Sequence, residues 1–463
     1  MRTTPKHGAR AKRSEAPLAL TQDDLLAPFH QAEKPASRWR VGTEAEKLGV
    51  RVADGAPVPY EGETGVRAVL AALADRHGWR VEREHEAGEV IALRRGDASI
   101  TLEPGGQLEL SGAPLRTIHE TCAEIRGHME ELRDISDELG IAWLGLGFHP
   151  LATQRELPWV PKLRYAIMRE YLPTRGAMGL DMMRRTATVQ ANFDYASEAD
   201  AARKLRVSLA IAPIVGAMFA NSPFVEGRAT GERSRRARVW LDVDPDRTGL
   251  LPFAWRDDFG YRDYVEWALD VPMFGFKRGG ELVANTGQPF RAFLKDGYRG
   301  HEATTYDWQT HLNTLFPEVR LKNILEIRCA DSQATAQVCA LPALLQGILY
   351  DERALDAAQA LVRGLDHDAV QAARAEVPGA GLRARLAGRE LAEWASELLA
   401  IAEGGLERLA HLDADGRDER IHLASLRALV ERGATPADAL LEEIDPERPL
   451  LPQLLASERA RLL

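Results

Sequence analysis

Apolar residues recur every three or four positions in several stretches of the chain, which is the period of an amphipathic helix. Residues 64–77 and 114–140 follow this period most clearly. Cys122 lies on the apolar stripe of the second stretch, so its default interpretation is a buried thiol. Capping residues predict two more helices, one beginning near Thr21 and one over residues 197–221.

Other stretches alternate apolar and polar residues at every second position, as half-buried strands do, or form short apolar runs. Strands are predicted at residues 38–50, 79–83, 89–95, 98–103, 141–150, 186–194 and 320–330. In the segment 186–194, Thr188, Gln190, Asn192 and Asp194 share one face. That face is interpreted either as the floor of a substrate site or as a solvated strand face.

The segment 100–111 places Glu103 and Glu109 on either side of a Pro-Gly-Gly break. A single extended strand puts both acids on one face, and a turn at 104–106 makes a hairpin in which they can still lie close together. Leu102, Leu108 and Leu110 alternate with them and are expected to face a core.

A second acidic pair, Glu44 and Glu46, lies two residues apart in the strand predicted at 38–50 and therefore shares a face. Two acidic pairs on neighbouring strands form a surface suited to hard cations with oxygen ligands. A solvated acidic face is the alternative interpretation of either pair.

Cationic side chains gather at three further places. Arg164 lies in a basic, aromatic segment, Arg236 lies among four arginines in residues 231–240, and Arg328 shares a strand face with Glu326. Guanidinium groups bind carboxylates and phosphates through paired hydrogen bonds. The alternatives are an exposed helix face for Arg164 and a flexible surface loop for Arg236.

Composition sets the broad class. The chain has 463 residues, 45% hydrophobic and 28% charged, and a net charge of −10. This is typical of a globular enzyme and gives no general affinity for nucleic acid or anionic membranes. No apolar run is long enough for a membrane helix, and the three cysteines form no CxxC motif, so a reducing cytoplasm is expected.

The domain organisation is predicted from changes in composition. Residues 1–20 are predicted to be a disordered basic arm, 21–350 a catalytic domain, and 351–463 a helical region of about five helices packed on the catalytic body. Walker, GxSxG, HExxH and kinase motifs are absent, so any nucleotide must be held by carboxylate-bound metals and arginines.

These segments together resemble plant-type glutamate–cysteine ligase, a family that also occurs in bacteria. The resemblance runs in matching order through residues 41–47, 101–111, 161–165, 179–183, 188–192, 219–224, 246–249, 316–322 and 339–343. It covers roughly residues 20–450.

The resemblance implies an α+β fold in which a curved antiparallel sheet forms a funnel flanked by helices, as in glutamine synthetase. It implies ATP-dependent joining of the glutamate γ-carboxylate to the cysteine amine through γ-glutamyl phosphate, with ATP as co-substrate and two or more Mg²⁺ ions. The expected partners are small molecules, with no nucleic acid and no membrane, and the expected assembly is a monomer or homodimer.

The residue roles follow from the same resemblance. The expected metal ligands or their immediate support are Glu44, Glu46, Glu103, Glu109 and Glu326. Glu103 and Arg328 are the expected catalytic residues, and Arg164 and Arg236 are expected to bind substrate carboxylates. Gln190, Asn192 and Phe274 are expected to complete the substrate pocket, although Phe274 stands where plant members have Tyr.

Cys122 and Cys339 resemble one regulatory disulfide pair of the plant enzymes and form a candidate redox pair. Two buried thiols are the alternative. A second plant pair is missing, because Asn285 stands at one of its positions. At most partial redox control is therefore expected.

Two other functions stay open at this point. One is a related ligase that joins glutamate to a different amine, and the other is a binding homologue without catalysis. The complete set of acids and arginines favours an enzyme over the second of these.

Overall fold

The computed structural model describes residues 20–83 and 88–460, and the basic arm predicted at residues 1–20 lies almost wholly outside them. A single antiparallel sheet runs through the centre of the molecule in the order β14-β15-β7-β1-β5-β4-β3-β2, and β6 also pairs with β1. Its strands are β1 (Val41–Arg51), β2 (Arg80–Arg83), β3 (Val90–Arg95), β4 (Ala98–Leu102), β5 (Leu108–Ser111), β6 (Ile141–Leu144), β7 (Thr188–Phe193), β14 (Val319–Leu321) and β15 (Leu325–Asp331).

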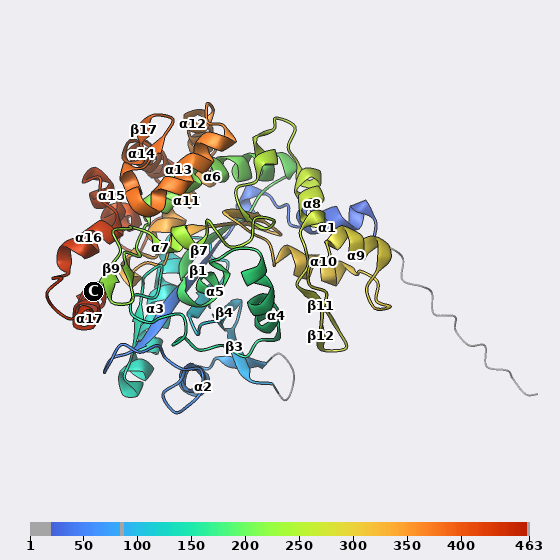
Figure 1. Cartoon of the computed structure of the whole chain (residues 1–463). Coiled ribbons are helices and arrows are strands. Elements are labelled where there is room, and N and C mark those ends of the chain that lie inside the picture. Colours follow the sequence, from blue (N-terminus) through green and yellow to red (C-terminus); the bar gives the residue numbers. More distant parts are fainter. Residues whose placement is uncertain (1–19, 84–87, 461–463) are drawn as a thin grey trace, which may run out of the picture.

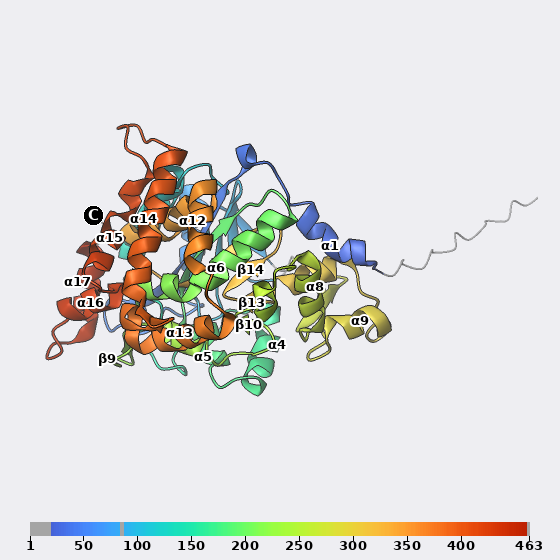
Figure 2. The same cartoon turned by 90° about the horizontal axis from the view of Figure 1, so that it is seen from above.

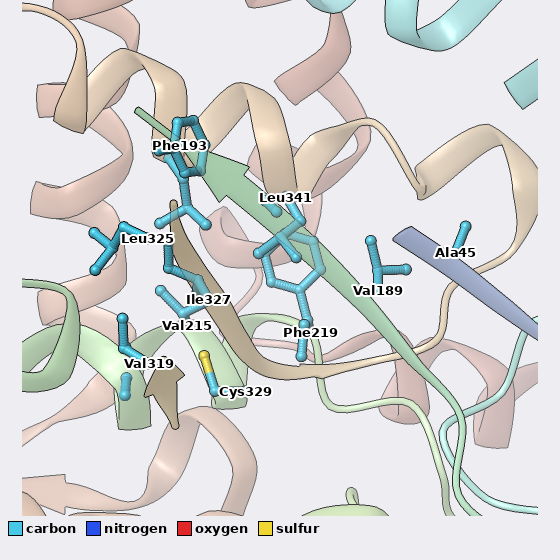
Figure 3. Packing of buried hydrophobic residues seen from close by; sticks show 14 of the residues in the cluster. Ala45, Val189, Phe193, Val215, Phe219, Val319, Leu325, Ile327, Cys329 and Leu341 are labelled. Atoms are coloured by element: carbon cyan, nitrogen blue, oxygen red, sulfur yellow. The ribbon is translucent and has the colours of Figure 1, made fainter. Parts of the chain in front are cut away.

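Helices α6 and α11 cover one face of this sheet (Figure 1). Val189 and Phe193 of β7 and Ile327 of β15 pack there against Val215 of α6 and Leu341 of α11, as Figure 3 shows. All five are buried, because alternate residues of each strand point to this side. The strand residues between them point to the opposite face, which is where a polar cavity opens.

The helices of the N-terminal three quarters of the chain surround the sheet and the cavity. They are α1 (Gln22–His30), α2 (Val66–His77), α3 (Ile118–Leu139), α4 (Leu163–Tyr171), α5 (Gly179–Arg185), α6 (Glu198–Met218), α7 (Arg235–Val239), α8 (Tyr261–Asp270), α9 (Phe290–Asp296), α10 (Thr305–Leu312) and α11 (Ala340–Leu349). A hairpin of β11 (Gly275–Arg278) and β12 (Glu281–Ala284) joins the group formed by α8, α9 and α10 (Figure 1).

The remaining helices are α12 (Glu352–Val362), α13 (His367–Ala380), α14 (Leu391–Leu409), α15 (Ala424–Glu431), α16 (Pro436–Glu443) and α17 (Leu450–Ala460). Of these, α12, α13 and α14 form a second layer behind α6 and α11, and α16 and α17 pack beside β1 and β6 (Figure 2). Leu398 and Trp394 of α14 belong to the same apolar core as Val189 and Ile327. The boundary predicted near residue 350 thus crosses a continuous core, and the division into domains stays a prediction.

Short two-residue strand pairs complete the structure. They are β8 (Phe224–Val225) with β9 (Arg228–Ala229), β10 (Thr248–Gly249) with β13 (Phe316–Pro317), and β16 (Arg385–Leu386) with β17 (Arg389–Glu390). None of the helices in the described segments has both the length and the apolar character needed to cross a membrane.

Several predicted elements change in detail. The segment 100–111 is a hairpin, with Thr101 opposite Glu109, and the buried Leu102, Leu108 and Leu110 confirm the predicted core face. The segment predicted as one strand at 320–330 is also a hairpin, β14 and β15.

Other boundaries differ because local hydrogen bonds override the apolar period. The helix predicted at 114–140 begins at Ile118, since Thr117 and Glu120 form a capping box and Leu115 pairs with Val41. The strand predicted at 141–150 ends at Leu144, and the C-terminal region has six described α-helices where about five were expected.

The close contact between α11 and α14 depends on two glycines, Gly347 and Gly405. A Cβ atom on Gly405 would lie 1.8 Å from the Gly347 carbonyl oxygen, a distance that requires the two helices to move apart. A Cβ atom on the neighbouring Gly404 would meet only the end of the Arg408 side chain, at 3.2 Å. Replacement of Gly405 by Ala should therefore lower the free energy of unfolding by about 2 kcal/mol or more.

The matched control is Gly404→Ala, which gains helix propensity of up to about 1 kcal/mol and should be neutral or stabilising. Urea unfolding of both variants and the wild type measures the difference. If Gly405→Ala unfolds at the wild-type urea concentration, α14 does not pack on α11 as described.

Candidate functional site

A cavity of about 330 Å³ opens on the polar face of the central sheet. Its acidic wall comes from β1, β5 and the turn of the β4–β5 hairpin, and α4, α7 and the residues after α10 cover it. The predicted site residues that line it are Glu44, Glu46, Glu103, Glu109, Arg164, Gln190, Arg236 and Arg328. The structure thus brings together side chains that lie up to 284 residues apart in the sequence.

The strand register explains how the acids meet. Glu46 of β1 lies directly opposite Glu109 of β5, and Glu44 lies opposite Ser111. Residues directly opposite on antiparallel strands have Cβ atoms about 5 Å apart, so Glu46 and Glu109 are near neighbours. Glu103 joins them from the hairpin turn, where its N–H donates to the Gln107 carbonyl at 2.9 Å.

Burial and mutual repulsion raise the pKa values of three of these carboxyl groups. Burial, with the Glu326 and Glu109 charges, raises the pKa of Glu44 to about 7. Burial, Glu103 and Glu109 raise the pKa of Glu46 well above its usual value, and burial and Glu103 raise that of Glu109. The protein alone therefore leaves a surplus of negative charge in this part of the cavity.

Hydrogen bonds hold the three carboxylates in place without neutralising them. Asn192 donates to Glu44 at 2.8 Å, the Thr188 N–H donates to Glu46 at 3.0 Å, and the Ser111 hydroxyl donates to Glu109 at 2.6 Å. Asn192 is thus a support of the acidic wall, and it lies outside the lining of the cavity.

Glu326 differs from the other four acids. Arg320 binds it with two guanidinium nitrogens, at 2.7 and 3.1 Å, Lys322 lies 2.8 Å from it, and Arg328 also contacts it. Burial acts to raise the pKa of Glu326, but Arg320, Lys322 and Arg328 outweigh it and hold that pKa well below the usual range. Its oxygens are occupied by cations in this structure, and its metal role stays a prediction.

The arginines predicted to bind substrate occupy different positions in the cavity. Arg236 is buried, its Nη2 donates to the Arg328 carbonyl at 2.7 Å, and its Nε has no hydrogen-bond partner among the described residues. Arg164 is exposed at the rim, over the ring of Tyr165. Of the four arginines in residues 231–240, only Arg236 lines this cavity, because Arg233, Arg235 and Arg238 pair with acidic side chains elsewhere.

Arg328 is held between Gln190, whose amide oxygen it approaches to 2.5 Å, and Glu326. Phe274 lies outside the lining of the cavity. It is buried beneath the Arg247 guanidinium, which lies 4.1 Å from the centre of its ring, and beside Tyr171. The structure therefore places Phe274 away from the other predicted substrate residues.

Sequence reasoning missed several residues of the cavity. Lys162, Arg320 and Trp240 line it, and the Trp240 Nε1 donor is buried without a partner among the described residues. Lys162 donates to the Leu102 carbonyl at 2.7 Å. Arg320 lies in the segment predicted as a strand, and both Arg320 and Lys322 bind Glu326. Because these three residues are an even number of positions apart, the alternation of the predicted strand could have placed Arg320 beside Glu326.

The donor set suits magnesium. Four carboxylates supply hard oxygen ligands, and burial together with neighbouring carboxylates raises the pKa values of three of them, Glu44, Glu46 and Glu109. No group of three or more carboxylate, imidazole or thiol side chains within residues 20–83 and 88–460 could hold a metal ion alone. The arrangement therefore fits Mg²⁺ only if further oxygen ligands, such as phosphates, accompany it.

A second cavity, of about 750 Å³, adjoins the first. Asn313 lines both cavities, and Lys322 on the second cavity's wall contacts Glu326. Three further cationic side chains line the second cavity, Lys34, Arg38 and Arg40. Glu33 is the one acidic side chain among its described lining residues, whereas the first cavity combines four carboxylates with cationic side chains.

Cys122 of α3 and Cys339, at the N-terminal end of α11, form a disulfide bond with Cα atoms 5.9 Å apart. Cys329 is buried and free. The structure thus joins the predicted cysteine pair, while its redox role stays a prediction.

Comparison with solved structures identifies two chains with a similar fold. A glutamate–cysteine ligase from Francisella tularensis, solved in complex with AMP, covers 92% of this chain and 88% of its own with a TM-score of 0.56 and 13% identity. A bifunctional glutathione synthetase from Pasteurella multocida covers 95% of this chain and 54% of its own, with a TM-score of 0.51 and 13% identity. At these identities the likeness concerns the α+β fold alone.

Sequence comparison is more specific. The chloroplastic glutamate–cysteine ligase of Brassica juncea is 43% identical over 92% of this chain and 82% of its own length, and that of Arabidopsis thaliana is 42% identical over 92% and 80%. Residues 40–454 match the glutamate-cysteine ligase family 2 profile. The chain belongs to glutamate-cysteine ligase family 2, which confirms the resemblance identified from its motifs.

The raised pKa of Glu44 generates a prediction about stability. The unfolded carboxyl group ionises near 4.5 and the folded one near 7, so the folded state loses stability as the pH rises through this interval. Glu44→Gln keeps the oxygen that accepts from Asn192 and removes the charge. The free energy of unfolding of the variant should exceed that of the wild type by about 1–3 kcal/mol above pH 7, with the difference vanishing below pH 4.5.

Urea unfolding at a series of pH values, without magnesium or nucleotide, measures this difference. The control is Glu138→Gln. Arg76 holds the pKa of this exposed carboxyl below its usual value, so removing the charge of Glu138 should not increase the free energy of unfolding above pH 7. A constant difference between Glu44→Gln and the wild type at all pH values would contradict the assignment.

Proposed function

We propose that the protein joins the γ-carboxylate of L-glutamate to the amine of L-cysteine at the expense of ATP. The γ-phosphoryl group passes from ATP to the γ-carboxylate, which gives γ-glutamyl phosphate and ADP. The cysteine amine then attacks the acyl carbon, the C–O bond to phosphate breaks, and γ-glutamylcysteine and phosphate leave. The convergence of four acids and four arginines on one cavity, in a member of this ligase family, carries the proposal.

The acidic wall is the proposed magnesium site. Glu44, Glu46, Glu103 and Glu109 would hold two or more Mg²⁺ ions together with phosphate oxygens, and Glu326 would support them. Bound magnesium would offset the negative charge of the polyphosphate during phosphoryl transfer. The surplus negative charge of the wall supports this assignment, because it is the charge that a cation compensates.

The arginines are the proposed substrate contacts. Arg236 and Arg164 are assigned to substrate carboxylates, and the buried donors Arg236 Nε and Trp240 Nε1 support this, since a bound carboxylate would give both a partner. Arg328, held by Gln190 and Glu326, is assigned to the transferring phosphoryl group. Phe274 lies behind Arg247 and would act on cysteine binding only indirectly.

The second cavity is the proposed nucleotide site. Lys34, Arg38, Arg40 and Lys322 supply positive charge, and the lining shared at Asn313 would let the polyphosphate reach the acidic wall. The sheet itself is proposed to be a variant of the glutamine-synthetase funnel. One antiparallel sheet with helices on one face and the acids on the other supports this proposal.

The reaction can be tested directly. The protein is incubated with Mg-ATP and glutamate, cysteine is added, and ADP and γ-glutamylcysteine are followed by mass spectrometry. ADP release should depend on both amino acids, and a panel of other amines should give less product than cysteine. Glu103→Gln should keep the circular dichroism spectrum of the wild type and release no ADP, because a metal ligand is lost.

Three outcomes would change the proposal. Faster product formation with another amine would replace cysteine as the acceptor, and absence of ADP under all conditions would indicate a binding homologue. Full activity of Glu103→Gln would remove this residue from the metal site.

The Cys122–Cys339 disulfide is proposed to give partial redox control. It joins α3 to α11, and α11 packs on β7, the strand that carries Gln190. Reduction by a dithiol converts the disulfide to two thiols and should lower the activity without abolishing it. Cys122→Ser cannot form the bridge, so its activity should not respond to the dithiol.

Activity assays and gel mobility of both proteins, with and without dithiothreitol, measure this effect. Equal wild-type activity and equal mobility in the two conditions would exclude regulation by this bond.

A further inference from the structure

Asp331 is a buried carboxylate behind the cavity, at the end of the strand that carries Glu326 and Arg328. It is absent from the cavity lining, and it accepts three hydrogen bonds. The Asn221 N–H and the Ser222 hydroxyl donate to its Oδ2 at 2.8 and 2.6 Å, and the Ser234 hydroxyl donates to its Oδ1 at 2.8 Å.

The same two serines hold the start of α7, the helix that carries Arg236. Ser222 Oγ accepts the N–H of Arg236 at 3.1 Å, and Ser234 Oγ accepts the N–H of Ala237 at 2.9 Å. A hydroxyl has one proton to donate. Both serine hydroxyls donate to Asp331, so both serine oxygens are left to accept from the helix.

This chain of hydrogen bonds matters because α7 is only five residues long, from Arg235 to Val239. A helix of this length has no stability of its own in water, so its direction depends on the groups that hold its first turn. Asp331 therefore fixes the backbone from which the Arg236 side chain extends into the cavity.

The position of Asp331 is itself fixed by packing. A Cβ atom on Gly147 would lie 2.3 Å from the Asp331 carboxyl carbon, so only glycine leaves room for the carboxylate. The wall on that side is backbone, which holds the carboxylate more firmly than a flexible side chain does.

Asp331 also compensates in part for the burial of the positive charge of Arg236. Burial lowers the pKa of the Arg236 guanidinium, and the negative charge of Asp331 is the strongest of the effects that oppose this shift. The oxygens of Asp331 are bound by Asn221, Ser222 and Ser234, so the compensation acts without occupying Arg236 Nε.

We propose that Asp331 is a positioning residue for substrate binding, which aligns α7 through Ser222 and Ser234 and leaves Arg236 available for a substrate carboxylate. This inference rests on the proposed function, in which Arg236 binds the carboxylate of an amino-acid substrate, and it takes glutamate as that substrate. The variant Asp331→Asn keeps the shape and removes the charge. The side-chain amide of this variant can itself donate a hydrogen bond to a serine oxygen. Both serine hydroxyls are therefore no longer required to donate to residue 331 and to accept from the helix.

Steady-state kinetics separate this role from a general loss of structure. Asp331→Asn should raise the KM for glutamate about tenfold and leave the KM for Mg-ATP within about twofold, because the lost alignment and charge act on Arg236 alone. Calorimetric titration of the nucleotide-free protein with glutamate should show the same weakening. Ser222→Ala and Ser234→Ala should shift the KM in the same direction, and they serve as the test if Asp331→Asn does not fold.

Glu419→Gln is the matched control. Glu419 is also fully buried, accepts three hydrogen bonds and holds the first N–H of a helix, that of Ile118 in α3, at 2.6 Å. None of the α3 residues lines the cavity. Glu419→Gln should lower the stability and leave the glutamate KM within about twofold of the wild type.

Arg236→Ala separates the two levels of the proposal. A glutamate KM unchanged by Arg236→Ala would overturn the assignment of glutamate to Arg236, and a cysteine KM that is also unchanged would overturn the role of Arg236 in the proposed function. A KM raised by Arg236→Ala and unchanged by Asp331→Asn and both serine variants would overturn the positioning role alone. Equal increases in the KM values for glutamate and Mg-ATP in Asp331→Asn would likewise indicate a purely structural residue.

Discussion

Strands β1, β7 and β15 must serve two environments at once, because successive side chains of a strand point to opposite faces of the sheet. Val189, Phe193 and Ile327 bury their apolar groups against α6 and α11 and stabilise the fold (Figure 3). The residues between them, such as Gln190 and Glu326, are thereby held on the other face, where the cavity lies. A one-residue shift of any of these strands would exchange the core for the site.

The two faces contribute in opposite ways to stability. The apolar face is closely packed and lies inside one continuous core. On the polar face, Glu44, Glu46 and Glu109 lie close together, and the charge of Glu109 raises the pKa values of the other two. The stability supplied by one face therefore supports an arrangement of charge on the other that is unfavourable in the free protein. Such a charge imbalance is common where a protein binds a charged ligand.

Much of this could be predicted from the sequence. The spacing of Glu44 and Glu46 and the alternation around Gln190 fixed which residues share a face, and the long motifs identified the family. The hairpin at residues 100–111 was left open, since a Pro-Gly-Gly segment is compatible with a turn or a kinked strand. The single strand predicted at 320–330 was wrong, because the turn at residues 322–324 has no glycine or proline to mark it.

Contacts between distant segments were beyond sequence reasoning. Phe274 gave no sign that Arg247 covers its ring. Asp331 was not singled out because its partners, Asn221, Ser222 and Ser234, lie about 100 residues earlier in the chain, with separations of 110, 109 and 97. Such groups become visible only when the helix that they hold is placed beside the strand.

The bond between Cys122 and Cys339 closes a covalent ring, because it joins two residues with a sequence separation of 217. Strands β1, β4 and β5, which bear the acidic wall, precede this ring, and β7 and β15, which bear Gln190 and Arg328, lie within it. The border between the two groups of strands is the hydrogen-bonded seam of β1 and β7. The anionic and the guanidinium halves of the cavity therefore come from topologically separate parts of the chain, and the sulfur bridge is the one covalent tie across that seam, apart from the backbone itself, in the described part of the molecule.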